Sequence, residues 1–127
     1  MIDAVSTICV FVSDQDRAKA FYTEKLGFEA RADMPMGPGS RWVAVAPQGA
    51  RTEVILYKMD ENWEHYRPVM GKSQALTFSV TNITALHDAL KAKGVRITSE
   101  PEKQPWGTFM MIMDPDENSL LLVEETK

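Results

Sequence analysis

Few side chains in this sequence of 127 residues combine reactive chemistry with an apolar setting. The carboxylate of Glu53 is directly followed by the apolar run Val54-Ile55-Leu56. If this carboxylate faces a cavity, it could act as a general base or anchor a hydroxyl or cationic group of a ligand. Alternatively, Arg41, Arg51 or a backbone donor satisfies the carboxylate and its role is structural. The sequence leaves both interpretations open.

The other candidates for reactive chemistry are one cysteine and two histidines. Cys9 lies within an apolar run, where burial would raise the pKa of its thiol and make it a poor nucleophile. His87 falls on the polar side of a predicted helix and is expected to be an exposed bystander, whereas His65 could overhang the mouth of a pocket. The sequence has no Ser-His-Asp order, phosphate-binding loop or dinucleotide fingerprint, so nucleotide and serine-hydrolase chemistry are not indicated.

Composition limits the class of protein. The length suits a single domain, and 44% hydrophobic residues can form a substantial core. The net charge of −4 without a basic stripe argues against a nucleic-acid partner, and no apolar run is long enough for a membrane helix. The N-terminus lacks the basic start and apolar segment of a signal peptide. A single cysteine cannot form an internal disulfide, and we expect a cytoplasmic protein.

Landmarks recur in the same order about 68 residues apart. The matching positions are Asp14 and Asn82, Pro38-Gly39 and Trp106-Gly107, and Pro47 and Pro115. The first pair marks predicted helix starts, because Asp and Asn are favoured capping residues, and the last pair marks predicted turns. Repeated landmarks at one spacing predict a duplicated module.

The hydrophobic patterns predict a β-α-β-β-β order in each half of the chain. In the first half, the expected strands are 5–12, 28–33, 41–46 and 52–58, with a helix at 14–25. In the second half, they are 74–80, 95–98, 108–113 and 119–124, with a helix at 82–93 and a Pro-containing loop at 99–105. We therefore predict one α+β domain, 1–127, with modules 1–58 and 73–127 and linker 59–72. Each helix can cover only one sheet face, so the two sheets should together form a cupped mixed sheet around a ligand cavity.

The predicted module boundaries coincide with recognisable motifs. Residues 12–28, VSDQDRAKAFYTEKLGF, resemble the opening motif of the glyoxalase, bleomycin-resistance and extradiol-dioxygenase superfamily, also called vicinal oxygen chelate proteins. Trp106-Gly107 and Asp114-Pro115-Asp116-Glu117-Asn118 resemble its closing motif, in which Gly is usual at the Glu117 position. The resemblance covers nearly the whole chain. It implies the cupped sheet of two modules and a homodimer, in some members with shared sites.

The resemblance also implies a set of four inward-facing positions, two per module, where the enzymes of this superfamily bind a divalent metal through His, Gln or Glu. In this sequence these positions are Thr7, Glu53, Ala75 and Leu121. Ala and Leu have no donor atom and neutral Thr is a weak ligand, which leaves Glu53 alone. We therefore expect no metal and no other cofactor.

Strand alternation and aromatic content complete the predicted site. Residues that share a strand face with the four positions should line the cavity, and aromatic rings can supply stacking area for a flat ligand. The candidate ligand-binding residues are Thr7, Cys9, Phe11, Trp42, Glu53, Tyr57, Ala75, Thr77, Trp106, Phe109 and Leu121.

Three functional hypotheses remain. The first is metal-free binding of a small, partly aromatic or hydrophobic molecule, as in superfamily members that sequester antibiotics. The second is a glyoxalase-like lyase or isomerase that uses Glu53 as its catalytic residue, with or without a loosely held metal. The third is a dimeric scaffold with a filled cavity, for which the bulky residues Phe11 and Leu121 are some evidence.

Overall fold

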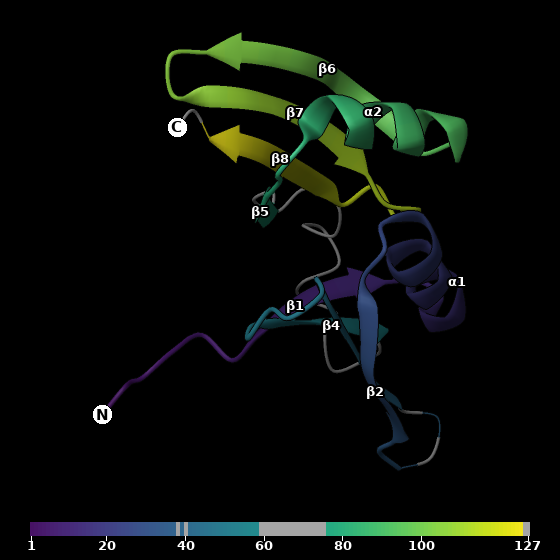
Figure 1. Ribbon diagram of the computed structural model, residues 1–127. Helices are drawn as coiled ribbons and strands as arrows, with labels where there is room; N and C mark the ends of the chain where they lie inside the picture. Colours follow the sequence, from purple (N-terminus) through teal and green to yellow (C-terminus); the bar gives the residue numbers. More distant parts are fainter. Residues whose placement is uncertain (38, 40, 59–75, 126–127) are drawn as a thin grey trace. The chain divides into compact units, whose positions relative to one another are not determined.

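The computed structural model describes residues 1–37, 39, 41–58 and 76–125 (Figure 1). The chain divides into two compact units, Met1–Pro68 and Val69–Lys127, each with one four-stranded mixed sheet. The predicted α+β class with two tandem β-α-β-β-β modules is confirmed. The predicted linker 59–72, with His65, and the candidate Ala75 lie outside the described residues, and the single-domain assignment stays a prediction. No helix in the described ranges is long and apolar enough to cross a membrane.

The first module consists of four strands and one helical segment. In chain order the elements are β1 (Thr7–Val12), α1 (Gln15–Ala20), the π-helical turn η1 (Phe21–Lys25), β2 (Glu29–Pro35), β3 (Arg41–Ala46) and β4 (Glu53–Lys58). The strand order in the sheet is β1-β4-β3-β2. β1 runs parallel to β4, and the other pairs are antiparallel. A parallel pair needs a long crossover, which the helical segment and the β2–β3 hairpin provide.

Helix α1 begins where the sequence predicts it. The Asp14 carboxylate accepts the backbone N–H of Arg17 at 3.0 Å, and this hydrogen bond lowers the pKa of Asp14. Gln15 is buried, and its Nε2 donates to the carbonyl oxygens of Leu56 at 2.8 Å and Arg41 at 3.1 Å. Because these carbonyls belong to β4 and β3, one side chain fixes the start of the helix to two strands.

The core of the first module lies between the helical segment and one sheet face. Ala18 and Tyr22 of the helical segment are fully buried. The strand residues buried with them alternate along β1, β3 and β4, and they are Val10, Val12, Val43, Val45, Val54 and Leu56. The other side of this sheet, opposite α1, is here called the open face of the first module.

The second module repeats this plan. Its elements are β5 (Leu76–Ser79), α2 (Ile83–Ala92), β6 (Arg96–Gln104), β7 (Gly107–Met113) and β8 (Ser119–Glu125), in the sheet order β5-β8-β7-β6. The Asn82 side chain caps α2 by accepting the N–H of Ala85 at 3.1 Å. The side of this sheet that is opposite α2 is called the open face of the second module.

One predicted boundary in the second module is wrong. Residues 99–105 were expected to form a loop because of their prolines, but β6 continues to Gln104 and pairs with β7. Pro101 is compatible with this strand, because β6 lies at the edge of the sheet and a proline there removes no ladder hydrogen bond on the solvent side.

The turn between β7 and β8 is organised by one buried carboxylate. Asp114 is 4% exposed; its Oδ1 accepts the backbone N–H groups of Asp116 and Asn118 at 2.9 Å, and its Oδ2 accepts from Asn118 Nδ2 at 2.9 Å. Glu117 has a positive φ of 65°, which explains why the resembled motif has Gly at this position.

Gly107, at the start of β7, is required for packing. Its φ is +153°, and a Cβ added there would lie 2.4 Å from the backbone oxygen of Glu124. The neighbouring strand therefore approaches too closely for any other residue. This contact gives the Trp106-Gly107 motif a structural reason.

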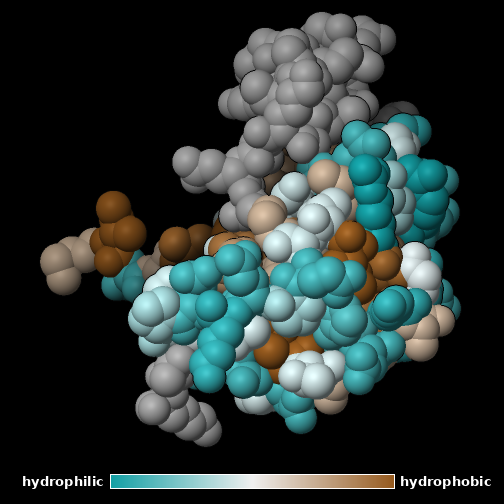
Figure 2. All heavy atoms as spheres, turned by 90° about the horizontal axis from the view of Figure 1, so that it is seen from above, coloured by the Kyte–Doolittle hydropathy of each residue, from teal (hydrophilic) through white to brown (hydrophobic). Residues whose placement is uncertain are grey.

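Several large apolar side chains remain exposed. They are Met1, Ile2, Val5, Ile8, Met34, Met36 and Trp106. The face drawn in Figure 2 is mostly hydrophilic, and its hydrophobic surface is divided into small patches. Exposed apolar groups of this size are candidates for contact with a ligand or a second chain.

Candidate functional site

The open face of the first module brings together all six of its predicted site residues. Thr7 is the register partner of Glu53, and Phe11 is the partner of Tyr57. Ala44 pairs with Ile55, so Trp42, two residues earlier in β3, lies on the same face. The six residues are Thr7, Cys9, Phe11, Trp42, Glu53 and Tyr57. Thr7 and Cys9 are exposed, and the other four are partly exposed.

Aromatic rings and one thiol form the apolar part of this face. The rings of Phe11 and Tyr57 meet edge to face with their centroids 6.3 Å apart. Partial desolvation raises the pKa of the Cys9 thiol above its ordinary value. The thiol is therefore protonated at neutral pH and is better suited to contact an apolar ligand than to attack one.

The polar part of this face is a cluster of three charged side chains. A bulge between Ala30 and Ala32 inserts Arg31 into β2, and its guanidinium contacts Glu29 Oε1 through Nε at 2.7 Å and Nη2 at 2.6 Å. Nη2 also donates to the Ala50 carbonyl at 2.7 Å, and Nη1 lies 3.4 Å from Glu53 Oε2. Glu53 thus has an arginine partner, as the structural alternative expected, but the arginine is neither Arg41 nor Arg51.

Arg41 is engaged in a different ion-pair network. Its guanidinium contacts Asp33 at 2.7 Å and Asp16 at 3.0 Å, and Lys19 Nζ lies 3.0 Å from the same Asp33 carboxylate. The hydrogen bonds from Arg41, followed by those from Lys19, lower the pKa of Asp33 to about 2. This network joins α1 to β2 and β3, and its charges neutralise each other.

The open face of the second module is largely apolar. Thr77 is the register partner of Leu121, and Phe109 lies beside Val123 on the same face. Trp106 is 52% exposed and stacks on Phe109, with centroids 5.7 Å apart and an interplanar angle of 19°. The partner of Leu121 is Thr77, which is two residues further along the chain than the assigned Ala75.

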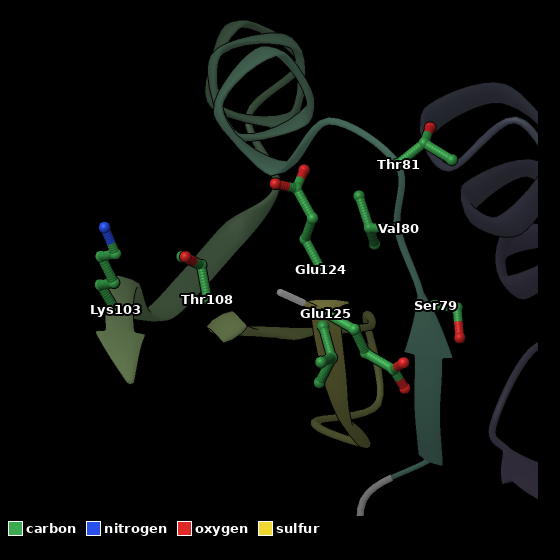
Figure 3. A pocket seen from close by; sticks show the side chains of 8 residues that line it. Ser79, Val80, Thr81, Lys103, Thr108, Glu124 and Glu125 are labelled. Atoms are coloured by element: carbon green, nitrogen blue, oxygen red, sulfur yellow. The ribbon is translucent and has the colours of Figure 1, made fainter. Parts of the chain in front are cut away.

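A groove of about 860 Å³ lies at the end of the second module's sheet (Figure 3). Its lining residues are Ser79, Val80, Thr81, Lys103, Thr108, Val123, Glu124 and Glu125. None of the predicted site residues lines it, although Ser79 and Val123 belong to the open face of that module. Glu124 Oε1 accepts the Ile83 N–H at 2.8 Å, so this carboxylate has a structural role at the start of α2.

His87 does not have the position that the sequence indicated. Its side chain is only 16% exposed and contacts the carboxylates of Glu100 and Asp88. The expectation of an exposed bystander is therefore wrong. His87 joins α2 to the edge strand β6 and lies away from the open face.

The donor atoms of the first module do not suit a divalent metal. Glu53 is the one carboxylate among its two metal-equivalent positions, and the adjacent Arg31 guanidinium would repel a cation. In the second module, Leu121 offers no donor and Thr77 only a neutral hydroxyl. Within the described ranges, no three His, Cys, Asp or Glu side chains are grouped so that they could hold a metal ion.

Comparison with known proteins places the chain in a family. Residues 4–122 match the Glyoxalase/Bleomycin resistance protein/Dioxygenase superfamily, and the chain belongs to it, as the motifs predicted. Similar solved structures include UcmS2, with 36% identity and a TM-score of 0.86 over 98% of this chain and 100% of that one. TnmS3, described as an antibiotic binding protein from Streptomyces sp. CB03234, has 35% identity and a TM-score of 0.85 over 98% of each chain.

The sequence comparison also finds a bacterial relative of full length. The uncharacterized protein YetH of Bacillus subtilis (strain 168) is 38% identical over 127 residues, which cover 98% of this chain and 100% of YetH. The similarity therefore extends over both modules.

Sequence reasoning missed two residues of the charged cluster, Glu29 and Arg31. They lie in a strand that the hydrophobic pattern defined poorly, and the bulge that turns Arg31 toward Glu53 has no proline or glycine marker. The available signal was the pair of opposite charges, Glu29 and Arg31, two residues apart within the predicted strand 28–33.

Proposed function

We propose that this protein binds a small, partly aromatic or hydrophobic molecule without the help of a metal. The observation that carries the proposal is the open face of the first module, where the Phe11–Tyr57 ring pair shares a surface with Glu53 and its partner Arg31. Such a surface offers stacking area beside a few polar groups, as ligand sites commonly do. The similarity to TnmS3, an antibiotic binding protein, supports a ligand of the antibiotic type.

The open face of the second module also has features of a ligand-binding surface. Trp106 and Phe109 form a stacked pair, and the ring of Trp106 is half exposed. Thr77 and Leu121 share that face. We propose that this face binds apolar ligand groups, and that Thr7, Cys9 and Trp42 contribute to binding on the open face of the first module; the participation of Ala75 stays a prediction.

Ligand binding can be tested by tryptophan fluorescence and equilibrium dialysis, with bleomycin and 2-naphthol as probes in buffer that contains EDTA. Phe11→Ala and Trp106→Ala should each raise Kd about tenfold, because each removes roughly 1.4 kcal/mol of ring contact. Ile8→Ala is the matched control, since Ile8 lies in β1 on the opposite face. Binding of neither probe would contradict the proposal and favour the scaffold hypothesis.

The second candidate function is a lyase or isomerase reaction with Glu53 as general base. One observation favours it: the Glu53 side chain is 30% exposed and borders the exposed Thr7, so a substrate can reach its carboxylate. Elemental analysis after purification, followed by assays with added nickel, zinc, manganese and iron, tests this function. Activity that disappears in Glu53→Gln would establish it, and metal-independent ligand binding that survives Glu53→Gln would argue against it.

We also propose that the protein is a homodimer in the cytoplasm. The exposed apolar residues Ile2 and Val5 lie before β1, which is an edge strand and can contact a second chain. Sedimentation equilibrium should give twice the chain mass, and a monomer at micromolar concentration would contradict the dimer. Cell fractionation tests the location.

A further inference from the structure

The guanidinium of Arg31 is held firmly on one side and loosely on the other. Nε and Nη2 make contacts of 2.6 to 2.7 Å with Glu29 and with the Ala50 carbonyl. The contact of Nη1 with Glu53 Oε2 is 3.4 Å, which is long for a charge-assisted hydrogen bond. Arg31 is therefore anchored by Glu29 and Ala50, while its Nη1 and the Glu53 carboxylate are incompletely engaged.

We propose that Arg31 and Glu53 together recognise the hydroxyl or N–H group of an uncharged aromatic ligand, with Glu53 accepting its proton and thereby determining specificity and Arg31 donating to its oxygen or nitrogen atom. This inference rests on the proposed ligand-binding function and adds the polar group that the ligand must carry. A hydroxyl group can donate to a Glu53 oxygen and accept from Arg31 Nη1 at the same time.

The hydrogen-bonding capacity of the pair supports this assignment. A guanidinium has five N–H donors, and those on Nε and Nη2 already have partners. The two donors on Nη1 have one long contact among the described residues. An ionised carboxylate accepts through two oxygens, and the part of the chain that the structure describes supplies one side-chain donor to Glu53, from Arg31.

The charge and exposure of the cluster restrict the ligand further. Two carboxylates surround one guanidinium, so the cluster carries an excess negative charge that disfavours an anionic ligand. The side chains of Arg31 and Glu53 are 23% and 30% exposed, which keeps the pair accessible from solvent. The Phe11–Tyr57 pair lies on the same face, and Tyr57 is in β4 with Glu53. An aromatic ring with a neutral donor group fits these features.

Three probes of one ring system test the inference: 2-naphthol, 2-methoxynaphthalene and 2-naphthoate. The wild type should bind 2-naphthol about tenfold more tightly than 2-methoxynaphthalene, because one hydrogen bond to a charged group contributes roughly 1.4 kcal/mol. It should bind 2-naphthoate most weakly. Glu53→Met should abolish the preference for 2-naphthol, because 2-methoxynaphthalene lacks only the proton that Glu53 accepts, and should leave the affinity for 2-methoxynaphthalene within about twofold, which a merely structural defect would not do. Arg31→Met should weaken both ligands by a similar factor of about ten, because the oxygen of either ligand can accept from Nη1.

The control variant is Arg51→Met, which removes the same charge from an exposed position close to β4 and should leave the affinities for both ligands unchanged. If Arg31→Met fails to fold, Arg31→Lys takes its place; it keeps the charge but lacks the planar fork, and the affinities for both ligands should fall about threefold. Equal binding of 2-naphthol and 2-methoxynaphthalene by the wild type, tightest binding of 2-naphthoate, an unchanged preference in Glu53→Met, or unchanged affinities in the Arg31 variants would overturn this inference alone. Binding of none of the probes would overturn the proposed function as well.

Discussion

One edge strand of each module, β2 in the first and β6 in the second, contains an inserted residue at a corresponding place, and β6 has a further irregularity between Ser99 and Glu102. In β2 the bulge lies between Ala30 and Ala32 and inserts Arg31, and in β6 it lies between Ile97 and Ser99 and inserts Thr98. Arg31 joins a charged cluster with Glu29 and Glu53, whereas the hydroxyl of Thr98 has one long contact of 3.4 Å with the Met111 carbonyl. The same backbone irregularity therefore carries a polar site in one module only.

The contacts between helix and edge strand occur at corresponding places in both modules but use different residue types. Lys19 of α1 pairs with Asp33 of β2, and His87 of α2 pairs with Glu100 of β6. The two modules thus share the bulge and the place of the helix-to-strand contact, while the side chains at these positions differ. Differences between matched positions therefore separate residues that maintain the fold from residues available for binding.

The largest expected effect comes from the matched glycines that precede or begin the third strand of each module. Gly107→Ala should lower the free energy of unfolding by about 3 kcal/mol, because the new Cβ would collide with the backbone of Glu124. Gly39→Ala should cost only about 1 kcal/mol, since no described residue approaches its Cβ position within 4 Å and only the positive φ of 72° opposes it. Urea denaturation measures both, and equal losses would contradict the packing role of Gly107.

A smaller effect is expected at the start of the first helix. Gln15→Ala should lower the free energy of unfolding by about 2 kcal/mol, because the buried carbonyl of Leu56 and the part-buried carbonyl of Arg41 lose their donor. The corresponding position of α2 is the buried apolar residue Ile83, which makes no such side-chain contact. Gln48→Ala is the control: its exposed 3.5 Å contact with Gly27 should be worth less than 0.5 kcal/mol. A similar loss in both variants would show that burial of Gln15 contributes nothing.

In the turn after β7, a substitution is expected to raise the free energy of unfolding instead of lowering it. Glu117→Gly should raise the free energy of unfolding by roughly 0.5 to 1 kcal/mol, since glycine removes the strain of the positive φ and the gain exceeds the added chain entropy. The exposed 3.5 Å ion pair with Arg96 that is lost contributes little. Glu117→Ala, which keeps the strain, should remain close to the wild type. Destabilisation by glycine would show that the Glu117 side chain matters more than its backbone.

The smallest expected effect is confined to acid conditions. The pKa of Asp33 in the folded protein is lowered to about 2, so its contribution to stability is present above the unfolded pKa of about 4 and is lost as the pH falls toward 2. Asp33→Asn should therefore show a smaller loss of stability between pH 4 and pH 2 than the wild type. Urea midpoints measured at several pH values test this, with Asp3→Asn in the exposed N-terminal segment as the control. Parallel pH profiles for wild type and Asp33→Asn would contradict it.

Much of the fold could be predicted from the sequence because its signals are local. Asp14 and Asn82 mark helix starts, and the apolar run in 41–46 predicts β3 with the observed bounds. The extent of β6 could not be predicted, because whether a proline is tolerated depends on whether the strand lies at the edge of the sheet, and sheet order is a non-local property.

The composition of the open faces could be predicted in part. Period-two alternation assigned Cys9, Phe11 and Thr77 to the faces of the metal-equivalent positions, since strand geometry determines which side a residue occupies, whereas the other aromatic candidates were proposed for their rings. The partner of Glu53 could not be predicted. Arg31 reaches it through a bulge and across 22 residues of sequence, and no local pattern distinguishes Arg31 from Arg41 or Arg51 as that partner.

The pairing of β1 with β4 joins residues far apart in the sequence, which has a consequence for the order in which parts of the two modules form. The Thr52 hydroxyl bonds to the carbonyl of Val5, 47 residues earlier in the chain, whereas the Asp114 contacts close a loop of only four residues. Closing the longer loop costs more entropy, so the β7–β8 hairpin can form early while β1 must wait until β4 exists. On a ribosome, Thr7, Cys9 and Phe11 would therefore acquire their neighbours only after Tyr57 has been synthesised.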